Sequence, residues 1–260
     1  GKFTGVPIVR IDEEMCREAV RLGARIGVLA TLPTTLEPTK HTIERVAREL
    51  KKQLGEDVEF LNYEDPSILA EVRDAGFVTA GAAARLVTMF MQAVQDKAEV
   101  VLNCCSSVGE VADAAVSIGK FTGVPIVRID EEMCREAVRL GKRIGVLATL
   151  PTTLEPTKHT IVRVSRELGK QVTLVDGLVE GAFGVDQEQF KALLGKTAEQ
   201  IRDQADVILL SQGSMAYAET FLSETYGIPV VSSPRFGAAS VRRALEAKGY
   251  QFERQGEMGC

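Results

Sequence analysis

An apolar run leads into two adjacent cysteines in the segment Val-Val-Leu-Asn-Cys-Cys-Ser-Ser-Val-Gly-Glu, residues 100–110. The run predicts a buried strand, and Ser107 and Glu110 have the spacing of a capping box that begins a helix. Cys105 therefore lies between the carboxyl end of a strand and a helix N-terminus, where the helix dipole and free N–H groups favour a thiolate and bind carboxylate oxygens. A thiol in this position is suited to moving a proton to and from carbon.

The competing interpretation is that both cysteines are small buried core residues. We expect this of Cys104, which faces the sheet. Cys105 is the candidate acid–base catalyst, and its neighbours Ser106 and Ser107 add hydroxyl donors. The five cysteines are odd in number and their spacing fits neither a zinc site nor a disulfide framework, so we expect reduced thiols and no metal.

A second apolar run, residues 207–210, leads into Ser-Gln-Gly-Ser at the matching place in the second half of the chain. The residue that matches the candidate thiol is Gln212 or Ser211. Gly213 and Ser214 offer N–H and hydroxyl donors to a ligand. Many loops in α/β proteins have this composition, so the segment is informative only together with the first one.

The segment Ala-Thr-Leu-Pro-Thr-Thr-Leu-Glu-Pro-Thr occurs twice, at residues 30–39 and 148–157. Each copy follows a strand pattern and opens a helix, with a proline in the first turn. The threonines would cap these helices, or hold a substrate carboxylate if both copies face one cleft; the candidates are Thr34, Thr35, Thr152 and Thr153. We expect His41 and His159, which are copies of each other, on helix surfaces.

These copies belong to a longer repeat, because residues 1–50 recur as residues 119–168 with three differences. The near-identity ends abruptly, which indicates a recent partial duplication or a constructed sequence.

Strand and helix patterns alternate along both halves of the chain. Continuous apolar strands between amphipathic helices are typical of parallel sheets covered on both faces. We therefore predict an α/β protein of two pseudo-symmetric doubly wound lobes, each with a four-stranded parallel sheet, and an active site in the cleft between them. The clearest predicted helices are 38–54, 80–95, 108–118, 131–140, 187–205 and 238–247.

We assign residues 24–118 to lobe A, completed by residues 236–250, and residues 119–235 to lobe B. Residues 1–23 encode one further strand and helix, which we expect to be peripheral or swapped with the closing unit. Residues 251–260 form a polar tail that we expect to be loose.

The composition excludes some classes of partner. The chain has 260 residues, 45% apolar content and a net charge of −5, which argues against binding to nucleic acid or an anionic membrane. No segment approaches the ~18 apolar residues of a membrane span, and the first residues lack a signal-peptide pattern. We expect a cytoplasmic protein whose partner is a small carboxylate.

The pattern Asn-x-Cys-Ser-Ser followed by Val-Gly-Glu-x-Ala-Asp, residues 103–113, resembles the first catalytic loop of the aspartate/glutamate and hydantoin racemase superfamily. The Ile-Gly-Val-Leu-Ala-Thr start of each half resembles the strand-one loops of the same superfamily. The resemblance covers residues 24–245. It implies two lobes that each supply one cysteine, no pyridoxal phosphate or metal cofactor, and frequent homodimers. Cys105 would be the first-lobe cysteine, and Ser106 and Ser107 would bind the substrate carboxylate.

The chain departs from this superfamily in the second lobe. The superfamily loop reads Gly-Cys-Thr or Gly-Cys-Ala, whereas this chain has Ser211-Gln212-Gly213, and an amide cannot supply a proton as a thiol does. Three interpretations follow. The chain is an amino-acid or hydantoin-type racemase with an unusual second acid, a one-cysteine decarboxylase or isomerase of a small carboxylate, as in arylmalonate decarboxylases, or a carboxylate-binding protein without catalysis.

Overall fold

The computed structural model describes residues 24–31, 37–55, 58–182 and 185–252. The duplicated residues 1–23, the predicted ligands Thr34 and Thr35, and nearly all of the C-terminal tail lie outside these ranges, so the expectations for them stay predictions.

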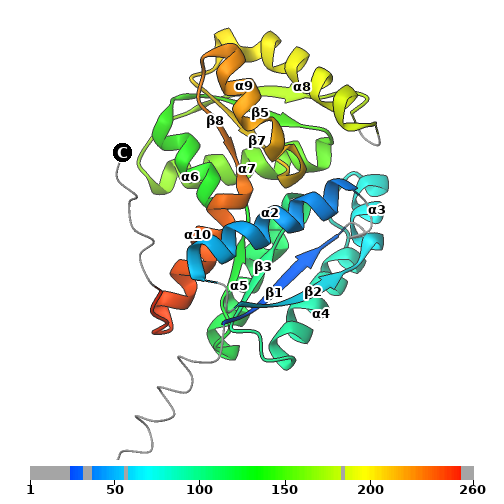
Figure 1. Ribbon diagram of the computed structural model, residues 1–260. Coiled ribbons are helices and arrows are strands. Elements are labelled where there is room, and N and C mark those ends of the chain that lie inside the picture. Colours follow the sequence, from blue (N-terminus) through cyan, green and yellow to red (C-terminus); the bar gives the residue numbers. More distant parts are fainter. Residues whose placement is uncertain (1–23, 32–36, 56–57, 183–184, 253–260) are drawn as a thin grey trace, which may run out of the picture.

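The chain forms two four-stranded sheets in which every pair of neighbouring strands is parallel. The strand order is β2-β1-β3-β4 in lobe A and β6-β5-β7-β8 in lobe B, so the two lobes repeat one topology (Figure 1). This confirms the predicted fold. The strands are β1 Ala24–Ala30, β2 Val58–Glu64, β3 Val100–Asn103, β4 Ile126–Arg128, β5 Arg143–Ala148, β6 Thr173–Leu178, β7 Val207–Leu210 and β8 Val230–Ser232.

Helices cover both faces of each sheet, as continuous apolar strands require. They are α2 Glu37–Leu54, α3 Pro66–Ala75, α4 Ala80–Gln95, α5 Gly109–Thr122, α6 Glu131–Leu140, α7 Pro151–Glu167, α8 Gln187–Ile201, α9 Glu219–Tyr226 and α10 Ser233–Ala247. Three short 3-10 helices, Ser106–Val108, Arg202–Gln204 and Gly213–Ala218, complete the described elements.

One helix, α3, was not expected from the sequence. Asp65 caps it by accepting a hydrogen bond from the Ser67 backbone N–H at 3.0 Å, and Pro66 fills its first turn. Gly76 ends it with a φ of 79°, a left-handed conformation that a glycine adopts without strain.

The core of each lobe has two layers, one on each face of its sheet. In lobe A, Leu29 packs with Leu86 and Phe90 of α4 on one face, and Ile26 packs with Leu50 of α2 on the other. Each of these side chains is fully buried, and each contributes roughly 1.5–3 kcal/mol to folding.

The last helix of each half crosses to the other lobe. Helix α6 follows β4 of lobe A, yet its Met133 and Ala137 pack with Ile144 of lobe B. Helix α10 follows β8 of lobe B, yet its Val241 and Leu245 pack in lobe A, where α10 lies beside α2 (Figure 1).

This crossing changes the predicted lobe boundary. Strand β4 pairs with β3, so residues 126–128 belong to the sheet of lobe A, although the predicted boundary assigned residues 119–235 to lobe B. The boundary lies after β4, because the chain leaves lobe A only when α6 begins.

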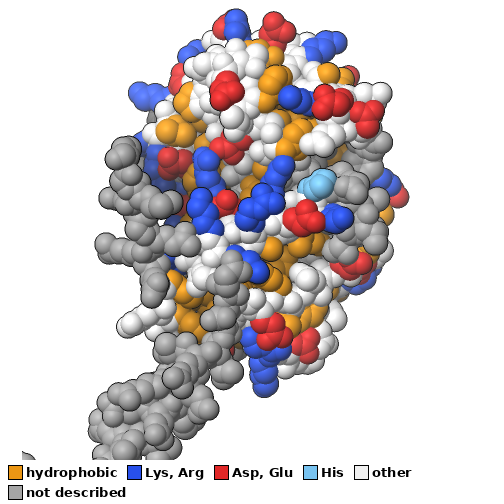
Figure 2. Space-filling view, viewed as in Figure 1, with side chains coloured by type: hydrophobic (Ala, Val, Ile, Leu, Met, Phe, Trp, Pro, Cys, Tyr) orange, Lys and Arg blue, Asp and Glu red, His pale blue; other side chains and the backbone are white. Residues whose placement is uncertain are grey.

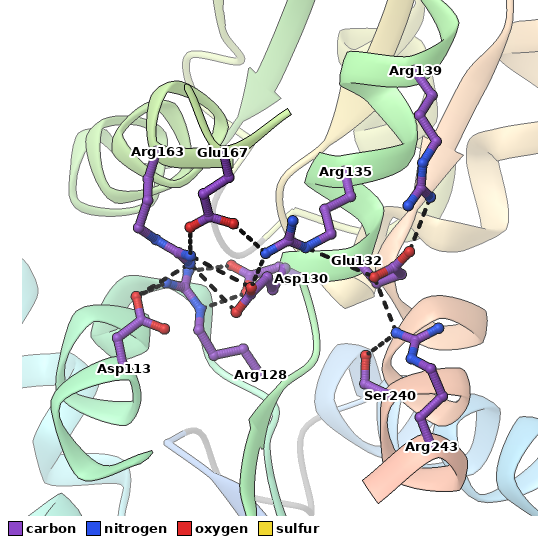
Figure 3. Close-up of polar contacts among 11 residues, drawn as sticks. Asp113, Arg128, Asp130, Glu132, Arg135, Arg139, Arg163, Glu167, Ser240 and Arg243 are labelled. Carbon is purple, nitrogen blue, oxygen red and sulfur yellow. Dashed lines mark hydrogen bonds and ion pairs between the residues drawn. The ribbon is translucent and has the colours of Figure 1, made fainter. Parts of the chain in front are cut away.

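Charged side chains join the lobes on the surface. Arg163 of α7 lies 3.6 Å from Asp113 of α5, and Arg243 of α10 lies 3.0 Å from Glu132 of α6 (Figure 3). On the face shown in Figure 2, acidic and basic side chains are interspersed, with Lys and Arg gathered over α2 and α10. Within the described ranges, no helix has the length and apolar character needed to cross a membrane.

Candidate active site

A small pocket lies where the carboxyl ends of the central strands of both lobes meet, which is the usual ligand position in doubly wound sheets. Its volume is about 90 Å³, enough for several waters or a small organic molecule. Its lining comes from both lobes and consists of hydroxyl, thiol, amide, glycine and apolar groups: Ala30, Thr31, Thr42, Ile43, Leu69, Cys104, Cys105, Ser106, Ser107, Leu150, Thr153, Gln212, Gly213 and Ser214.

Cys105 lies at the predicted junction of a strand and a helical segment. It immediately precedes the 3-10 helix Ser106–Val108, which continues into α5, and its backbone is extended. The Asn103 side-chain amide donates a hydrogen bond to the Cys105 carbonyl at 2.9 Å and so fixes the turn. The residue is only partly buried, so a ligand in the pocket can reach it.

Two opposing effects set the pKa of the Cys105 thiol. Burial raises the pKa, while hydrogen bonds from the hydroxyls of Thr31 and Ser107 and from the N–H groups of Ser107 and Val108 lower it. Burial prevails, so the pKa lies above the ordinary thiol value and the thiol is protonated at neutral pH. The expectation that the helix start would favour a thiolate included the Ser107 hydroxyl and the N–H groups of the helix start, but it lacked the Thr31 hydroxyl and the larger effect of burial.

The neighbouring Cys104 also lines the pocket but packs into the opposite face of the sheet, with the apolar cluster of β1, α2 and α10. Burial, and then the proximity of Cys105, raise the pKa of Cys104 to about 12. Cys105 is therefore the more easily ionised thiol of the two.

The register of the sheets identifies the residue of lobe B that corresponds to Cys105. Leu29 pairs with Asn103 in lobe A, and Leu147 pairs with Leu210 in lobe B. Two residues beyond each pair stand Cys105 and Gln212, and both adopt extended backbone before a 3-10 helix. Gln212 is thus the counterpart of Cys105, and the alternative, Ser211, is the counterpart of Cys104.

The Gln212 side chain is held in place by Thr149, the lobe B counterpart of Thr31. The Thr149 backbone N–H donates to Gln212 Oε1 at 2.9 Å, and Gln212 Nε2 donates to Thr149 Oγ1 at 2.9 Å. Thr31 and Thr149 therefore have matching roles, since each forms a hydrogen bond with a side chain that follows the neighbouring strand. Thr31 contacts Cys105 beyond β3, and Thr149 contacts Gln212 beyond β7. Sequence analysis missed both, although each is the first polar residue after an apolar strand.

Two hydroxyl contacts connect the lobes in the pocket floor. Ser106 Oγ donates to the Ser211 carbonyl at 2.9 Å, and the hydroxyls of Ser107 and Thr153 lie 2.7 Å apart. The hydroxyl proton of Ser106 is therefore engaged in the bond to the Ser211 carbonyl. The Ser107–Thr153 pair holds two protons, one for the mutual bond and one for the hydrogen bond from Ser107 to Cys105.

The other predicted site residues differ in position. Gly213 and Ser214 line the pocket, whereas Thr152 is buried outside the lining and its hydroxyl has no hydrogen-bond partner among the described residues. His159 is exposed and lies 2.9 Å from Glu110, in keeping with a surface role. His41 lies 3.4 Å from Glu44.

A buried ion pair that the sequence did not predict lies behind the Cys105 loop. Arg128 donates to both carboxylate oxygens of Asp130, at 2.8 and 2.9 Å, and to Asp113 at 2.7 Å (Figure 3). Arg128 also lies so close to Gly109 that a side chain there would collide with it. The pair fixes the first turn of α5, and so the loop before it. Within the described ranges, no cluster of His, Cys, Asp and Glu has the arrangement of a metal site.

The chain is similar to one protein family and to several solved structures. The family model described as Asp/Glu/Hydantoin racemase matches residues 38–241. Among solved structures, a glutamate racemase from Bacillus anthracis is 15% identical with a TM-score of 0.65, covering 90% of this chain and 85% of the other. An allantoin racemase from Klebsiella pneumoniae is 16% identical with a TM-score of 0.62, covering 90% and 92%.

An arylmalonate decarboxylase without ligand shares the architecture as well, with 20% identity, a TM-score of 0.55 and coverage of 90% and 96%. No curated protein sequence matches the chain. At these identities the solved structures show a shared fold.

Proposed function

Because this chain belongs to the Asp/Glu/hydantoin racemase family, we propose that it is a cofactor-independent isomerase in which Cys105 moves a proton at the carbon next to a carboxyl or carbonyl group. The observation that carries the proposal is the position of Cys105, which lines a small pocket between the lobes beside hydroxyl donors from both.

The reaction needs an acceptor for the charge that develops on the substrate oxygens. The reaction starts from the ionised form of Cys105, whose thiol proton has gone to solvent. When the C–H bond breaks, the proton goes to this thiolate sulfur and the electron pair forms an enediolate. The Ser107 hydroxyl, which no longer stabilises a thiolate once Cys105 has gained the proton, and the Ser214 hydroxyl would donate to the enediolate oxygens, and such donors lower the barrier. The thiol then returns the proton to the same carbon.

The test is exchange of the α-proton in heavy water, followed by NMR over a panel of small acids and hydantoins. We expect at least one compound to exchange, and Cys105→Ala to abolish the exchange. Cys134→Ala is the matched control, because Cys134 is buried in α6 away from the pocket lining. Exchange that survives in Cys105→Ala would contradict the proposal.

One observation favours a second candidate, a decarboxylase. Gln212 occupies the position that corresponds to Cys105 and is held by Thr149, so the pocket has a thiol in one lobe and, in the matching position of the other, an amide that cannot act as an acid. In this reaction the bond to a carboxyl group breaks, carbon dioxide leaves, and the Cys105 S–H gives its proton to the resulting carbanion. A thiol that burial keeps protonated suits this role.

Release of carbon dioxide from a substituted malonate, with a single product enantiomer, would favour the decarboxylase. Exchange without loss of carbon dioxide would favour the isomerase. Saturable binding with neither reaction would support the third interpretation, a binding protein.

A further inference from the structure

The chain contains the sequence of helix α6 twice. Residues 1–23 are identical to residues 119–141, which form the end of α5, strand β4 and helix α6. The copy of α6 is residues 13–22, Glu-Glu-Met-Cys-Arg-Glu-Ala-Val-Arg-Leu. Residues 1–23 lie outside the described ranges, but every one of their counterparts is described. The surroundings of α6 therefore indicate what kind of surface its copy can pack on.

Helix α6 covers one face of the lobe B sheet. It packs on β5 and β7 and on α7, the helix that follows β5. Its fully buried side chains are Met133, Cys134, Ala137 and Val138. A second surface with the same apolar residues in the same arrangement would accept the same helix.

The lobe A face beneath α10 is such a surface. Residues 24–50 and 142–168 are copies, so β1 and most of α2 repeat the residues of β5 and α7. The register places Val100 and Leu102 of β3 where β7 also has a valine and a leucine. The copied residues buried on this face are Ile26, Val28 and Val46, the counterparts of Ile144, Val146 and Val164. None of the three differences between the copies falls among them.

A charged residue of α2 also matches the copy. In lobe B, Glu167 of α7 pairs with Arg135 of α6. The counterpart of Glu167 on α2 is Glu49, which has no ion-pair partner within the described ranges. The counterpart of Arg135 in the copy is Arg17. Docking of the copy would therefore give Glu49 a partner that α10 does not supply.

The copy is also joined to lobe A in the way that α6 is joined to lobe B. Helix α6 ends at Leu140, and β5 begins at Arg143. The counterpart of Leu140 is Leu22, and β1 begins at Ala24. A link this short keeps residues 13–22 beside the face at a high effective concentration.

We propose that the lobe A face formed by β1, β3 and α2 is a docking surface for residues 13–22 of the same chain, folded as a helix like α6, and that this segment competes with α10 for it. Helix α10 occupies the face in this structure, lies beside α2 (Figure 1), and buries Ala238, Val241 and Leu245 on it. Because both helices cover the same apolar residues, docking of one excludes the other. Docking of residues 13–22 would also break the Arg243–Glu132 pair between α10 and α6.

A double-variant experiment on the full chain tests the competition. Val241→Asp places a carboxylate on the buried side of α10 and so removes α10 from the face. The variant should keep a cooperative thermal transition, because residues 13–22 then cover the face. Ala19→Asp, at the counterpart of the buried Ala137, blocks the copy and should change the melting temperature by no more than about 2 °C on its own. The two substitutions together should abolish the transition.

The matched control for Ala19→Asp is Glu18→Ala, since its counterpart Glu136 pairs with Arg139 of the same helix. Combined with Val241→Asp, it should leave the transition in place. If Val241→Asp alone abolishes the transition, or if Ala19→Asp costs the Val241→Asp chain no more than it costs the parent, the proposal is wrong.

Alkylation of Cys16 reports docking directly and does not require unfolding. Its counterpart Cys134 is fully buried in α6, so Cys16 should become inaccessible when the copy docks. In a Cys134→Ala chain, where mass spectrometry distinguishes the two peptides, Val241→Asp should slow alkylation of Cys16 at least about tenfold. Val241→Ala, which loosens α10 without adding a charge, should slow it in the same direction.

An unchanged alkylation rate for Cys16 in both variants would refute the docking surface. Slowing that increases with protein concentration and accompanies a dimer in size-exclusion chromatography would show that the segment of a second chain occupies the face, and would refute docking within one chain.

Discussion

The Ser106 hydroxyl donates a hydrogen bond to the Ser211 carbonyl at 2.9 Å, across the boundary between the lobes. Ser106 follows Cys105, and Ser211 precedes Gln212. The bond therefore connects the two loops that carry Cys105 and Gln212, which line the pocket from the two lobes, and it is buried from solvent.

Removing this hydroxyl should weaken both stability and catalysis. Ser106→Ala leaves the Ser211 carbonyl buried without its donor, which costs about 1–3 kcal/mol of unfolding free energy in a chemical denaturation experiment. The turnover rate should fall more than substrate affinity, because the loops lose their alignment. Ser240→Ala, which removes a hydroxyl bonded within its own helix, is the control and should change both quantities little.

The protonation of Cys105 predicts how alkylation depends on pH. Because burial raises the pKa of Cys105, its rate of reaction with iodoacetamide should increase with pH and reach half of its maximum above the ordinary thiol pKa. Cys104, with a pKa of about 12, contributes little below that pH. Thr31→Val removes a donor that stabilises the thiolate and should shift the midpoint to higher pH. An unchanged midpoint in Thr31→Val would show that the hydroxyl does not stabilise the thiolate.

The correspondence of Gln212 and Cys105 predicts the effect of a second thiol. We expect positions 105 and 212 to face a ligand from opposite sides, so Gln212→Cys should supply an acid opposite Cys105 and increase the ratio of racemisation to α-proton exchange. Gln212→Ala removes the amide without adding an acid and is the matched control. Chiral chromatography and NMR on the same samples measure the two rates. Equal ratios in both variants would contradict the assignment of opposite faces.

The buried ion pair predicts a stability that depends on pH. Burial disfavours the charged form of Asp130, but Arg128 prevails and holds the pKa of Asp130 below its usual value. The pair therefore stabilises the fold above the unfolded-state pKa, about 4, and this contribution is lost as the pH falls through the lower folded-state pKa.

Asp130→Asn should accordingly cost about 3 kcal/mol at neutral pH, since it leaves the Arg128 charge buried with only Asp113 beside it. Asp203→Asn removes an exposed carboxylate and is the control. Urea denaturation at neutral and acid pH checks both points. A cost that is the same at pH 7 and pH 3 would indicate that the charge of Asp130 is not the cause.

The sequence predicts regular elements well where local patterns agree with the packing. Helices α4 and α6 occupy the predicted residues 80–95 and 131–140, because each has an amphipathic pattern and a clear start. Helix α3 was missed although Asp65-Pro66 is a strong helix start, because a short helix after a strand is easily read as a loop.

The site was predicted in part. Position after a strand makes Cys105 a candidate, and Cys105 lines the pocket, as does Cys104; the catalytic role of Cys105 stays a prediction. The choice between Gln212 and Ser211 needed the register of the strands, which no local pattern provides. The raised pKa of Cys105 and the Arg128–Asp130 pair also escape sequence analysis, since both depend on burial created by residues distant in the chain.

The crossing of α6 and α10 means that a cut between the two sheets would not yield two independent proteins. The first half without residues 1–23, expressed alone, would carry α6, which packs on the sheet of lobe B, but would lack α10, so the sheet face around Ile26 would be exposed to water. The second half would carry α10 but lack α6, and the sheet face around Ile144 would be exposed. We therefore expect the two lobes to fold and unfold in one cooperative transition, although they repeat the same topology.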